Sequence, residues 1–587
     1  MKRPADRSTR LSLAFVLIPA VIACADGEPL VPIVEDPNPE PDVDEPIEDD
    51  DPPDDEDPII LDPPNDDDPE LPPAFIVDCT APAAVVCGTT HTGDVEIRNA
   101  DDVAALEGVE CVEGNLTIQG SGLHALTGLE SLRRVDGFFS IQLNSVLLTL
   151  AGLENLQEVT KSFDIINNDQ LPNLDALHSL SAVGGLRIQN NDVMTGIHGI
   201  VGVATIAGDL YVSFMPELKT LEGLDCVAEV EGDLSIARND ALDDLKGLHQ
   251  LTRVGGEADI SENRKLVDVS ALSELIEVED HLFFDENDLL VEIDGLSSLV
   301  YVGGVLSIGF NQVLTTATGF DALESVGSLN VEANPALVDM AFPALTTVEA
   351  NLGIRNNAAL PDLTGLVAVE SVGIDLLIDR NQSLTSLGGM QSFTTIGRQI
   401  LIDLNDVLAD VDGLALVTDV PNTLDITWNP MLTDLSGLSN LVSAFNLGVR
   451  FNDGLTEFSL DALESVTETI LIVDNLELKN FSAPGLAHVG KLVSVRKNDE
   501  LTTFDMPQLL DVGTDLIISE NFALSTFDVT GLTSVGGWIG VTENCALSLS
   551  GVSNLLDDLP EVADGWCVWN SPNICPSNAG SDGNCAE

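Results

Sequence analysis

The sequence predicts a β-rich fold, a right-handed parallel β-solenoid of about 19 rungs, each 23 or 24 residues long. Three observations predict it. The stretch LSIARNDALDDLKGLHQLTRVGGE, which begins at Leu234, is followed at once by the similar stretch ADISENRKLVDVSALSELIEVEDH, which begins at Ala258. Each unit opens with an alternating Leu-x-Ile segment typical of a strand. An asparagine then recurs at one fixed position after that segment.

The consensus unit, L-x-I-x-x-N-x-x-L-x-x-L-x-G-L-x-x-L-x-x-V-x-G-x, describes one turn of a coil. Its Leu and Ile alternate inward, the Gly after the fourth apolar position permits a tight corner, and the V-x-G step leads back to the next strand. One unit cannot bury its own apolar side chains, whereas stacked units can. With rungs about 4.8 Å apart, the stack is expected to form a rod roughly 90 Å long.

The repeated asparagines are expected to form a buried structural ladder. A side-chain amide at the inward bend of the strand can bond backbone groups of its own rung and of the neighbouring rung that would otherwise lack partners. Met215 and Ser121 replace the asparagine in two rungs. The ladder asparagines are Asn144, Asn168, Asn191, Asn239, Asn263, Asn287, Asn311, Asn334, Asn357, Asn381, Asn405, Asn429, Asn452, Asn475, Asn498, Asn521 and Asn544.

The segment VVCGTTHTGDVEIRNADDVAALEGVECVEGNLTIQG resembles the start of the receptor L-domain family, with two cysteines around an irregular first turn and GNLTI opening the first full rung. That family includes ligand-binding domains of growth-factor and insulin receptors, fungal wall proteins and bacterial lipoproteins, and is related to leucine-rich repeats. The resemblance covers roughly residues 79–560 and implies a disulfide between Cys87 and Cys111. Unlike the receptor modules, this chain continues through about three modules' worth of rungs without a cysteine-rich spacer.

Residues 1–23 are typical of a signal peptide, because the basic MKRPADRSTR precedes an apolar segment too short to cross a membrane as a helix. The sequence VIAC ends at Cys24 and resembles a bacterial lipobox, although Val21 stands where that pattern usually has Leu. The resemblance implies lipid attachment at Cys24 and, with Ala25 after it, a place at the outer membrane or cell surface of a Gram-negative bacterium. Ala23 and Ala25 also offer an ordinary cleavage site, which would give plain secretion.

Residues 24–74 are expected to form a disordered, acidic, proline-rich tether behind the lipid anchor. From Asp26 to Pro73 there is no Lys or Arg and no apolar periodicity, so this segment cannot bury enough surface to fold. At roughly 3.1 Å per residue it reaches on the order of 150 Å. The segment is expected to be a solvated spacer. Loose binding of divalent cations by its carboxylates is the alternative, because no ordered Asp-x-Asp-x-Asp-Gly loop provides a specific calcium site.

The chain has 98 acidic and 23 basic residues and a formal net charge of −75. This charge disfavours nucleic acid and anionic lipid surfaces as partners and favours cations and cationic surfaces. A second interpretation is that the acidic coat keeps an apolar-rich solenoid soluble, including in a salty environment.

The cysteines cluster at the two ends of the repeat region, where disulfides would close the exposed apolar ends of the stack. We expect a disulfide-bearing N-terminal cap at 75–113, a solenoid at 114–548 and a cysteine-containing C-terminal cap and tail at 549–587. Cys226 lies several rungs from either cluster and is expected to be a buried thiol beyond disulfide reach. The clustered cysteines are Cys79, Cys87, Cys111, Cys545, Cys567, Cys575 and Cys585.

No catalytic pattern is found in the sequence. The seven histidines are scattered, neither H-E-x-x-H nor G-x-S-x-G occurs, and no Cys/His set has zinc spacing. The sequence therefore predicts a non-enzymatic protein without metal or cofactor.

Aromatic and basic residues gather at outward strand positions. Seven basic residues are expected on one sheet face, namely Arg187, Arg238, Arg355, Arg380, Arg450, Arg496 and Lys497. Trp428, Phe451 and Arg450 stand on adjacent rungs and combine an apolar platform with a guanidinium, a composition typical of binding hot spots and sugar-stacking surfaces. The candidate ligand-binding residues are Trp428, Phe451, Arg450, Arg380, Leu404 and Arg355. The alternative is cross-strand packing that stabilises the sheet, or cover of these residues by the C-terminal tail.

These features together predict a lipid-anchored cell-surface protein that acts in adhesion or recognition. Its expected ligand is a surface protein or polysaccharide, bound on the exposed sheet face. The alternative is a structural component of the envelope without a specific ligand.

Overall fold

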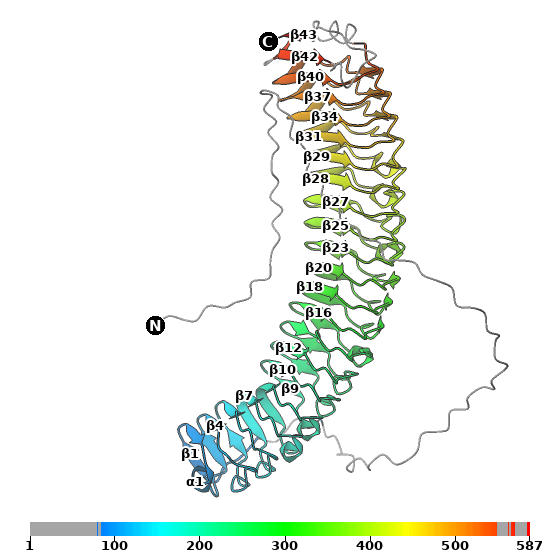
Figure 1. Ribbon diagram of the computed structural model, residues 1–587. Helices are drawn as coiled ribbons and strands as arrows, with labels where there is room; N and C mark the ends of the chain where they lie inside the picture. Colours follow the sequence, from blue (N-terminus) through cyan, green and yellow to red (C-terminus); the bar gives the residue numbers. More distant parts are fainter. Residues whose placement is uncertain (1–78, 80–83, 549–560, 563–564, 570–583, 587) are drawn as a thin grey trace, which may run out of the picture. The chain divides into compact units, whose positions relative to one another are not determined.

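The computed structural model describes residues 79, 84–548, 561–562, 565–569 and 584–586. The expected signal peptide, Cys24 with its lipid, the tether and most of the C-terminal tail lie outside the described residues. The fold is a parallel β-solenoid of about 20 turns with little helix, which confirms the predicted fold class. The coils follow one another in chain order from β1 to β42 (Figure 1).

Each coil contributes its Leu-x-Ile segment to one column of parallel strands, here called the front column. Every front-column strand pairs with the strand one repeat away, for example Leu210 with Leu234. These strands are β2 (Val95–Ile97), β4 (Leu116–Gln119), β6 (Phe139–Gln142), β10 (Leu210–Ser213), β12 (Leu234–Ala237), β14 (Ala258–Asp259), β16 (Leu282–Asp285), β23 (Leu352–Arg355), β25 (Asp375–Asp379), β27 (Gln399–Asp403), β34 (Leu492–Arg496), β37 (Leu516–Ser519), β40 (Trp538–Thr542) and β42 (Gly565–Trp569).

The V-x-G step forms a second column directly before the front column. Its strands are β1 (Thr90–Thr92), β3 (Cys111–Glu113), β5 (Arg134–Val135), β9 (Thr205–Ile206), β11 (Glu229–Val230), β13 (Arg253–Val254), β15 (Glu277–Val278), β22 (Thr347–Val348), β24 (Ser371–Val372), β26 (Thr395–Ile396), β33 (His488–Val489), β36 (Asp511–Val512), β39 (Ser534–Val535) and β41 (Glu561–Val562). Seven longer strands run through both columns: β7 (Glu158–Ile166), β8 (Ala182–Gln189), β18 (Tyr301–Gly309), β20 (Ser325–Glu332), β28 (Asp419–Thr427), β29 (Ser443–Arg450) and β31 (Ser465–Val473).

The remaining side of the coil varies between short strands and single 3₁₀ turns. One small sheet holds β17 (Glu292–Ile293), β19 (Thr316–Ala317) and β21 (Asp339–Met340), and another holds β30 (Glu457–Ser459), β32 (Asn480–Ser482), β35 (Thr503–Asp505) and β38 (Thr526–Asp528). The helical segments are α1 (Ala100–Ala104), η1 (Asp175–Leu177), η2 (His198–Ile200), η3 (Ser270–Leu272), η4 (Thr364–Leu366), η5 (Asp412–Leu414) and η6 (Ser436–Leu438).

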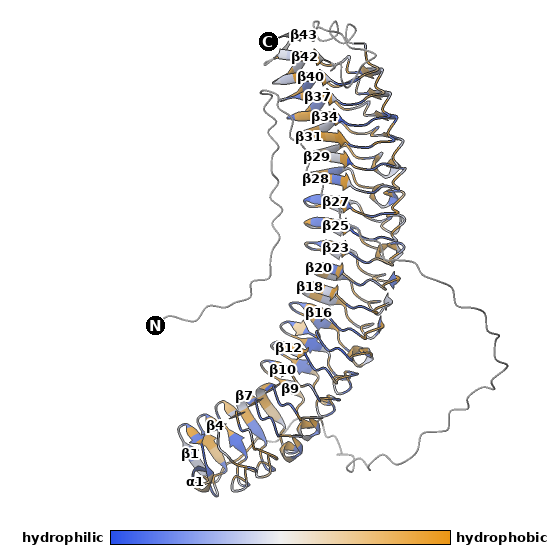
Figure 2. Ribbon diagram, in the orientation of Figure 1, coloured by the Kyte–Doolittle hydropathy of each residue, from blue (hydrophilic) through white to orange (hydrophobic). Residues whose placement is uncertain are grey.

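One continuous apolar core fills the stack. Consensus Leu, Ile and Val positions are almost completely buried in successive coils, as at Leu424, Ile426 and Leu432. Both hydrophobic and hydrophilic residues occur in the strands (Figure 2), as expected where alternate side chains enter the core. In the later coils Phe458, Phe481 and Phe504 stack at 5.2–5.4 Å between ring centroids inside this core.

The asparagines form a hydrogen-bonded ladder along the stack. Asn405 is fully buried. Its Nδ2 donates to the Ile378 carbonyl at 3.0 Å, and its backbone N–H donates to Asn429 Oδ1 at 3.1 Å. Its own Oδ1 accepts from the backbone N–H of Asn381 at 3.1 Å. Each rung therefore satisfies a backbone donor of the rung before it.

The two substituted rungs keep the ladder's backbone donors paired. The Met215 sulfur accepts from the backbone N–H of Asn191 at 3.4 Å, and the Met215 N–H donates to Asn239 Oδ1 at 3.2 Å. At the first rung, the backbone N–H and the hydroxyl of Ser121 both donate to Asn144 Oδ1. The ladder thus depends on an acceptor at this position more than on the amide itself.

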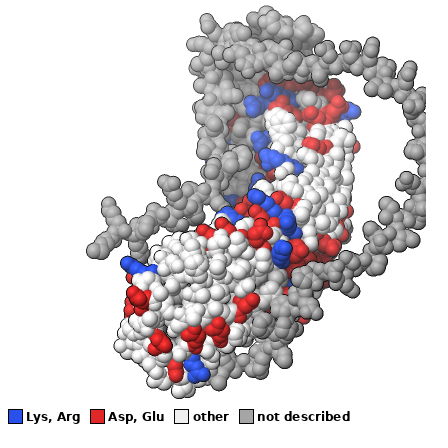
Figure 3. Space-filling model, turned by 60° about the horizontal axis from the view of Figure 1, so that its bottom comes forward, with Lys and Arg blue, Asp and Glu red and all other residues white. Residues whose placement is uncertain are grey.

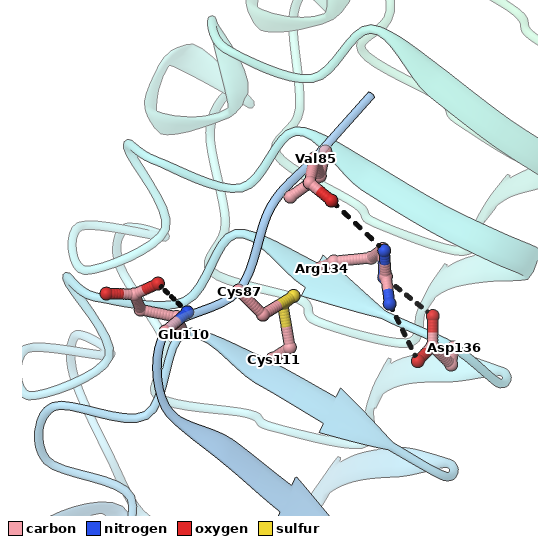
Figure 4. The surroundings of a disulfide bond; sticks show 7 residues. Val85, Cys87, Glu110, Cys111, Arg134 and Asp136 are labelled. Atoms are coloured by element: carbon pink, nitrogen blue, oxygen red, sulfur yellow. Dashed lines mark hydrogen bonds and ion pairs between the residues drawn. A yellow bond between two sulfur atoms is a disulfide. The ribbon is translucent and has the colours of Figure 1, made fainter. Parts of the chain in front are cut away.

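The predicted Cys87–Cys111 disulfide is confirmed, with the two Cα atoms 5.9 Å apart (Figure 4). Beside it, Arg134 Nη1 donates to the Val85 carbonyl at 3.2 Å, and the Gly88 N–H donates to the Glu110 carboxylate at 2.7 Å. The bridge and these bonds tie the chain before β1 to the first coils.

The expectation of a free thiol at Cys226 is wrong, because Cys226 forms a disulfide with Cys79. Five coil-to-coil pairings separate Val112 from Val230, so the coils of Cys111 and Cys226 lie about 24 Å apart. The eight Cα–Cα steps from Cys79 to Cys87 can span about 26 Å when extended. The sequence argument failed because it placed all N-terminal cysteines in the first coil.

At the C-terminal end, Cys545 and Cys567 are each disulfide-bonded. Strand β42 pairs with β40 in parallel, and β43 (Asn584–Ala586) pairs with β42 in the antiparallel direction. The parallel column therefore ends against a reversed strand, which occupies the edge that a further coil would use.

Replacing Asn405 by Ala should lower the free energy of unfolding by about 1–3 kcal/mol, because buried backbone groups on both sides lose their partners. Chemical denaturation measures the loss, and Asp406→Ala, an exposed neighbour, serves as the control. Equal stability of the two variants would contradict the ladder.

Replacing both Cys79 and Cys226 by Ser should destabilise the first coils by about 2–4 kcal/mol, because the bridge closes a chain segment of 147 residues. Thermal unfolding checks the loss, and peptide mapping of the unreduced protein should yield the linked Cys79–Cys226 peptides. Alkylation of Cys226 in denatured but unreduced protein would refute the bridge.

Candidate functional site

One residue in every full coil adopts a left-handed backbone conformation directly before the ladder position. We call this row the edge column. Its φ angles lie between 53° and 60° at Leu143, Asn167, Asn190, Phe214, Arg238, Glu262, Glu286, Phe310, Ala333, Asn356, Arg380, Leu404, Trp428, Phe451, Asp474, Lys497, Glu520 and Glu543, with Gly120 in the first rung at 55°. This conformation ends the front strand and turns the following ladder residue into the core.

Four of these left-handed positions carry aromatic residues. Glycine and asparagine adopt this conformation at the lowest cost, whereas other residues pay of order 1 kcal/mol or more. Phe214, Phe310 and Trp428 nevertheless stand there with 42%, 48% and 52% of their surface exposed, and Phe451 is half-buried. The turn does not require these side chains, so the backbone geometry does not explain their presence.

Trp428 and Phe451 form a parallel aromatic pair on adjacent coils. Their ring centroids lie 4.3 Å apart and their planes differ by 6°. Leu404 precedes Trp428 by one coil in the same column. Because the rings stack along the coil axis, one face of each ring is covered and the ring edges form much of the exposed surface.

The arginines of the predicted platform are engaged with carboxylates of the front column. Arg450 pairs with Asp425. Arg355 Nε and Arg380 Nη1 approach the two oxygens of Asp379 at 2.6 Å and 2.5 Å. In the space-filling view, basic side chains lie beside acidic ones and form no continuous basic patch (Figure 3).

The Arg450–Asp425 pair depends on a glycine at the intervening strand position. Gly448 lies opposite Asp425 on the adjacent coil, and a Cβ there would lie 2.2 Å from Asp425 Oδ1, so a larger residue would displace the carboxylate from its position beside Arg450. Burial raises the pKa of the Asp425 carboxyl, and the Arg450 charge opposes that rise. The first effect of Arg450 is therefore to compensate the charge of a half-buried carboxylate.

A second stretch of the edge column holds an internal cation–aromatic contact. The Arg238 guanidinium lies 4.8 Å from the centre of the Phe214 ring and donates to both carboxylate oxygens of Glu262, at 2.8 Å and 2.6 Å. The basic and aromatic members were visible in the sequence, but the acidic partner was missed. The signal that could have found it is the 24-residue register, which places the three residues on consecutive coils.

Two shallow depressions lie along the same stretch. One, of about 290 Å³, is lined by Phe214, Pro216, Arg238, Asp240, Glu262 and Arg264. The other, of about 370 Å³, is lined by Glu262, Arg264, Glu286, Asp288, Phe310 and Gln312. Both combine an aromatic wall with charged side chains.

Neither a metal site nor a membrane-spanning helix is present among the described residues. No group of three or more His, Cys, Asp or Glu residues there is arranged to hold a metal ion. No helix in the same part of the chain is long and apolar enough to cross a membrane.

The coil stack and its repeat define a leucine-rich-repeat-like solenoid. No protein-family model and no curated protein matches the chain. Among solved structures, the chain is similar to a TLR13–ssRNA13 complex, with 13% identity, a TM-score of 0.19, and 80% of this chain and 86% of that chain covered. It is also similar to a leucine-rich repeat protein from Bacteroides ovatus ATCC 8483, with 12% identity, a TM-score of 0.15, and coverages of 76% and 85%.

Tyr211 on the front column should ionise at unusually high pH. Burial and the nearby Asp209 and Asp233 raise its pKa to about 12, and its hydroxyl donates to Asp233 at 3.1 Å. A tyrosine in an unfolded chain ionises near pH 10, so the stability that Tyr211 contributes is present below about pH 10 and is lost as the pH rises towards 12.

Absorbance titration, with circular dichroism recorded in parallel, tests this expectation. Only two tyrosines are present, so Tyr211→Phe should remove the step near pH 12 and Tyr301→Phe should keep it. Persistence of that step in Tyr211→Phe would contradict the assignment.

Proposed function

We propose that the chain recognises a macromolecular ligand through the edge column, with the segment from Arg380 to Phe451 as the principal contact. The observation that carries this proposal is the placement of exposed aromatic side chains at left-handed positions. Local backbone preference opposes these residues, and violations of local preference are expected at functional sites. Trp428, Phe451 and Leu404 supply the apolar centre that binding hot spots require.

The geometry of the aromatic pair favours a protein over a glycan as the ligand. A sugar ring stacks on an open aromatic face, whereas Trp428 and Phe451 cover one face of each other. The neighbouring edge-column residues Leu404 and Asp474 stand one coil beyond the other faces. The exposed ring edges form an apolar strip that suits the side chains of a partner protein.

We further infer that this surface is displayed outside the cell. The lipobox-like sequence ending at Cys24 and the acidic segment that follows it support a lipid-anchored protein at the outer membrane or cell surface. The acidic segment would hold the solenoid away from the membrane, where a partner on another surface can reach the edge column.

A structural role in the envelope without a specific ligand is the second candidate. It is favoured by the stacking itself, because a 4.3 Å contact between Trp428 and Phe451 also holds adjacent coils together. The engagement of Arg450 with Asp425 is consistent with the same role.

A Trp428→Ala/Phe451→Ala double variant of residues 75–587 should lose saturable binding to intact cells by tenfold or more, because both anchors of the apolar strip are removed. Fluorescence-labelled protein measures the binding, and extracted envelope polysaccharide is tested in parallel. Leu289→Ala/Val291→Ala, which removes side chains 48% and 46% exposed away from the edge column, is the matched control.

Both variants must first match the parent in melting temperature. Binding that the double variant retains would remove the edge column from the function and favour the structural role. Binding to polysaccharide alone, lost in the double variant, would replace the protein ligand by a glycan.

A further inference from the structure

Five consecutive edge-column residues, Phe214, Arg238, Glu262, Glu286 and Phe310, form a charged stretch several coils away from the Trp428 segment. In the first half of this stretch, the guanidinium comes from Arg238 of the chain itself. Arg238 lies over the Phe214 ring and donates two hydrogen bonds to Glu262. An aromatic ring and a carboxylate in this column therefore hold a guanidinium between them.

The second half also holds an aromatic ring and a carboxylate, but on adjacent coils, and no residue of the column stands between them. Phe310 is 48% exposed, and Glu286 stands on the adjacent coil with an exposed side chain. In the described part of the chain, the Glu286 carboxylate makes no ion pair or hydrogen bond, and the cation–aromatic contacts involve other rings. Both residues line the depression of about 370 Å³.

Asp288 and Arg264 complete the wall of this depression. Arg264 is 68% exposed and stands 4.0 Å from Asp288 and 3.8 Å from Asp240, so it is shared between two carboxylates at the limit of ion-pair distance. Glu262, on the opposite wall, is engaged by Arg238. Glu286 and Asp288 thus face the depression with Arg264 loosely shared, while Arg238, which is hydrogen-bonded to Glu262, acts on Glu286 through its charge alone.

We propose that this depression takes an arginine side chain of a basic partner protein. Its guanidinium would lie over Phe310 from the side of the depression and donate to Glu286 and Asp288, so it would make the two kinds of contact that Arg238 makes with Phe214 and Glu262. The net charge of −75 favours a basic partner and raises its rate of encounter. This inference rests on the proposed function, because it names the partner's chemistry at another part of the same column.

The test uses the full-length chain and a fluorescent peptide with three arginines separated by glycines. Anisotropy is measured at 0.15 M salt, where diffuse attraction to the acidic chain is screened. Glu286→Gln/Asp288→Asn should weaken peptide binding about tenfold, because charge-assisted hydrogen bonds are lost. Phe310→Leu, which keeps an apolar side chain but removes the ring, should weaken it about threefold.

The matched control is Asp474→Asn/Glu520→Gln, which makes the same change of charge in the same column away from Phe310. It should bind as the parent does, and a peptide with citrulline in place of arginine should not bind. Equal losses in the two carboxylate variants, or equal binding of the citrulline peptide, would overturn the proposal. Stronger binding of a lysine peptide would also overturn it in favour of an ammonium site.

The same variants separate this inference from the proposed function. If the peptide experiment fails while Trp428-dependent binding to cells persists, only the arginine site is wrong. If cell binding is independent of Trp428 but the peptide site behaves as expected, the principal contact was misplaced and the arginine site stands.

Discussion

The buried ladder position is the constraint on which the rest of the structure depends. The Asn405 amide bonds Ile378 and Asn381 of the coil before and Asn429 of the coil after, so it fixes the spacing and register of successive turns. To bring that amide inside, the preceding residue must turn through a left-handed conformation in every coil. The core, the strand columns and the edge column all follow from this one turn.

Met215 shows what the ladder requires. A thioether is a weak acceptor and has no N–H to donate, yet the backbone donor of Asn191 still finds it at 3.4 Å. One such rung is tolerated because its neighbours keep complete asparagine bonding. In the interior of the stack, Met215 therefore replaces asparagine with a side chain that is also buried and accepts a hydrogen bond.

Much of the fold could be predicted because equivalent positions of the repeat occupy the same structural environment in nearly every coil. Leu-x-Ile, the asparagine and V-x-G each appear in nearly every unit, so their burial and strand pairing follow from the period. The Cys79–Cys226 bridge could not be predicted, because the segment before the first coil has no repeat to place it. The alternation between 23 and 24 residues was also visible, but it does not decide the structure at the corner. The 23-residue coils with Phe481 and Phe504 form a strand there, whereas the 23-residue coils with η1 and η6 form a 3₁₀ turn.

The candidate site likewise has one part that could be predicted from the sequence and one part that could not. Register alone brought Trp428 and Phe451 onto adjacent coils, whereas the ion pairs of Arg355, Arg380 and Arg450 depend on how far each side chain bends across the sheet. That direction depends on local space, such as the gap left by Gly448 beside Asp425. The repeat period predicts the column in which a residue lies, but not the residue that its side chain contacts.

The ladder residue fixes the backbone of each turn, so the edge-column residue before it can vary without a change of fold. The backbone turn is imposed by the ladder residue and the packing of the coils, so the residue before it can be Leu404, Trp428, Glu286 or Lys497 without a change in φ of more than a few degrees. Each non-glycine residue there adds strain, which the surrounding stack supports because every coil is held on both sides. Side chains on this column are consequently displayed at a fixed spacing of about 4.8 Å on a rigid frame. A row of that kind can present an apolar strip in one segment and an aromatic–carboxylate pair in another, and a partner that spans several coils can read both at once.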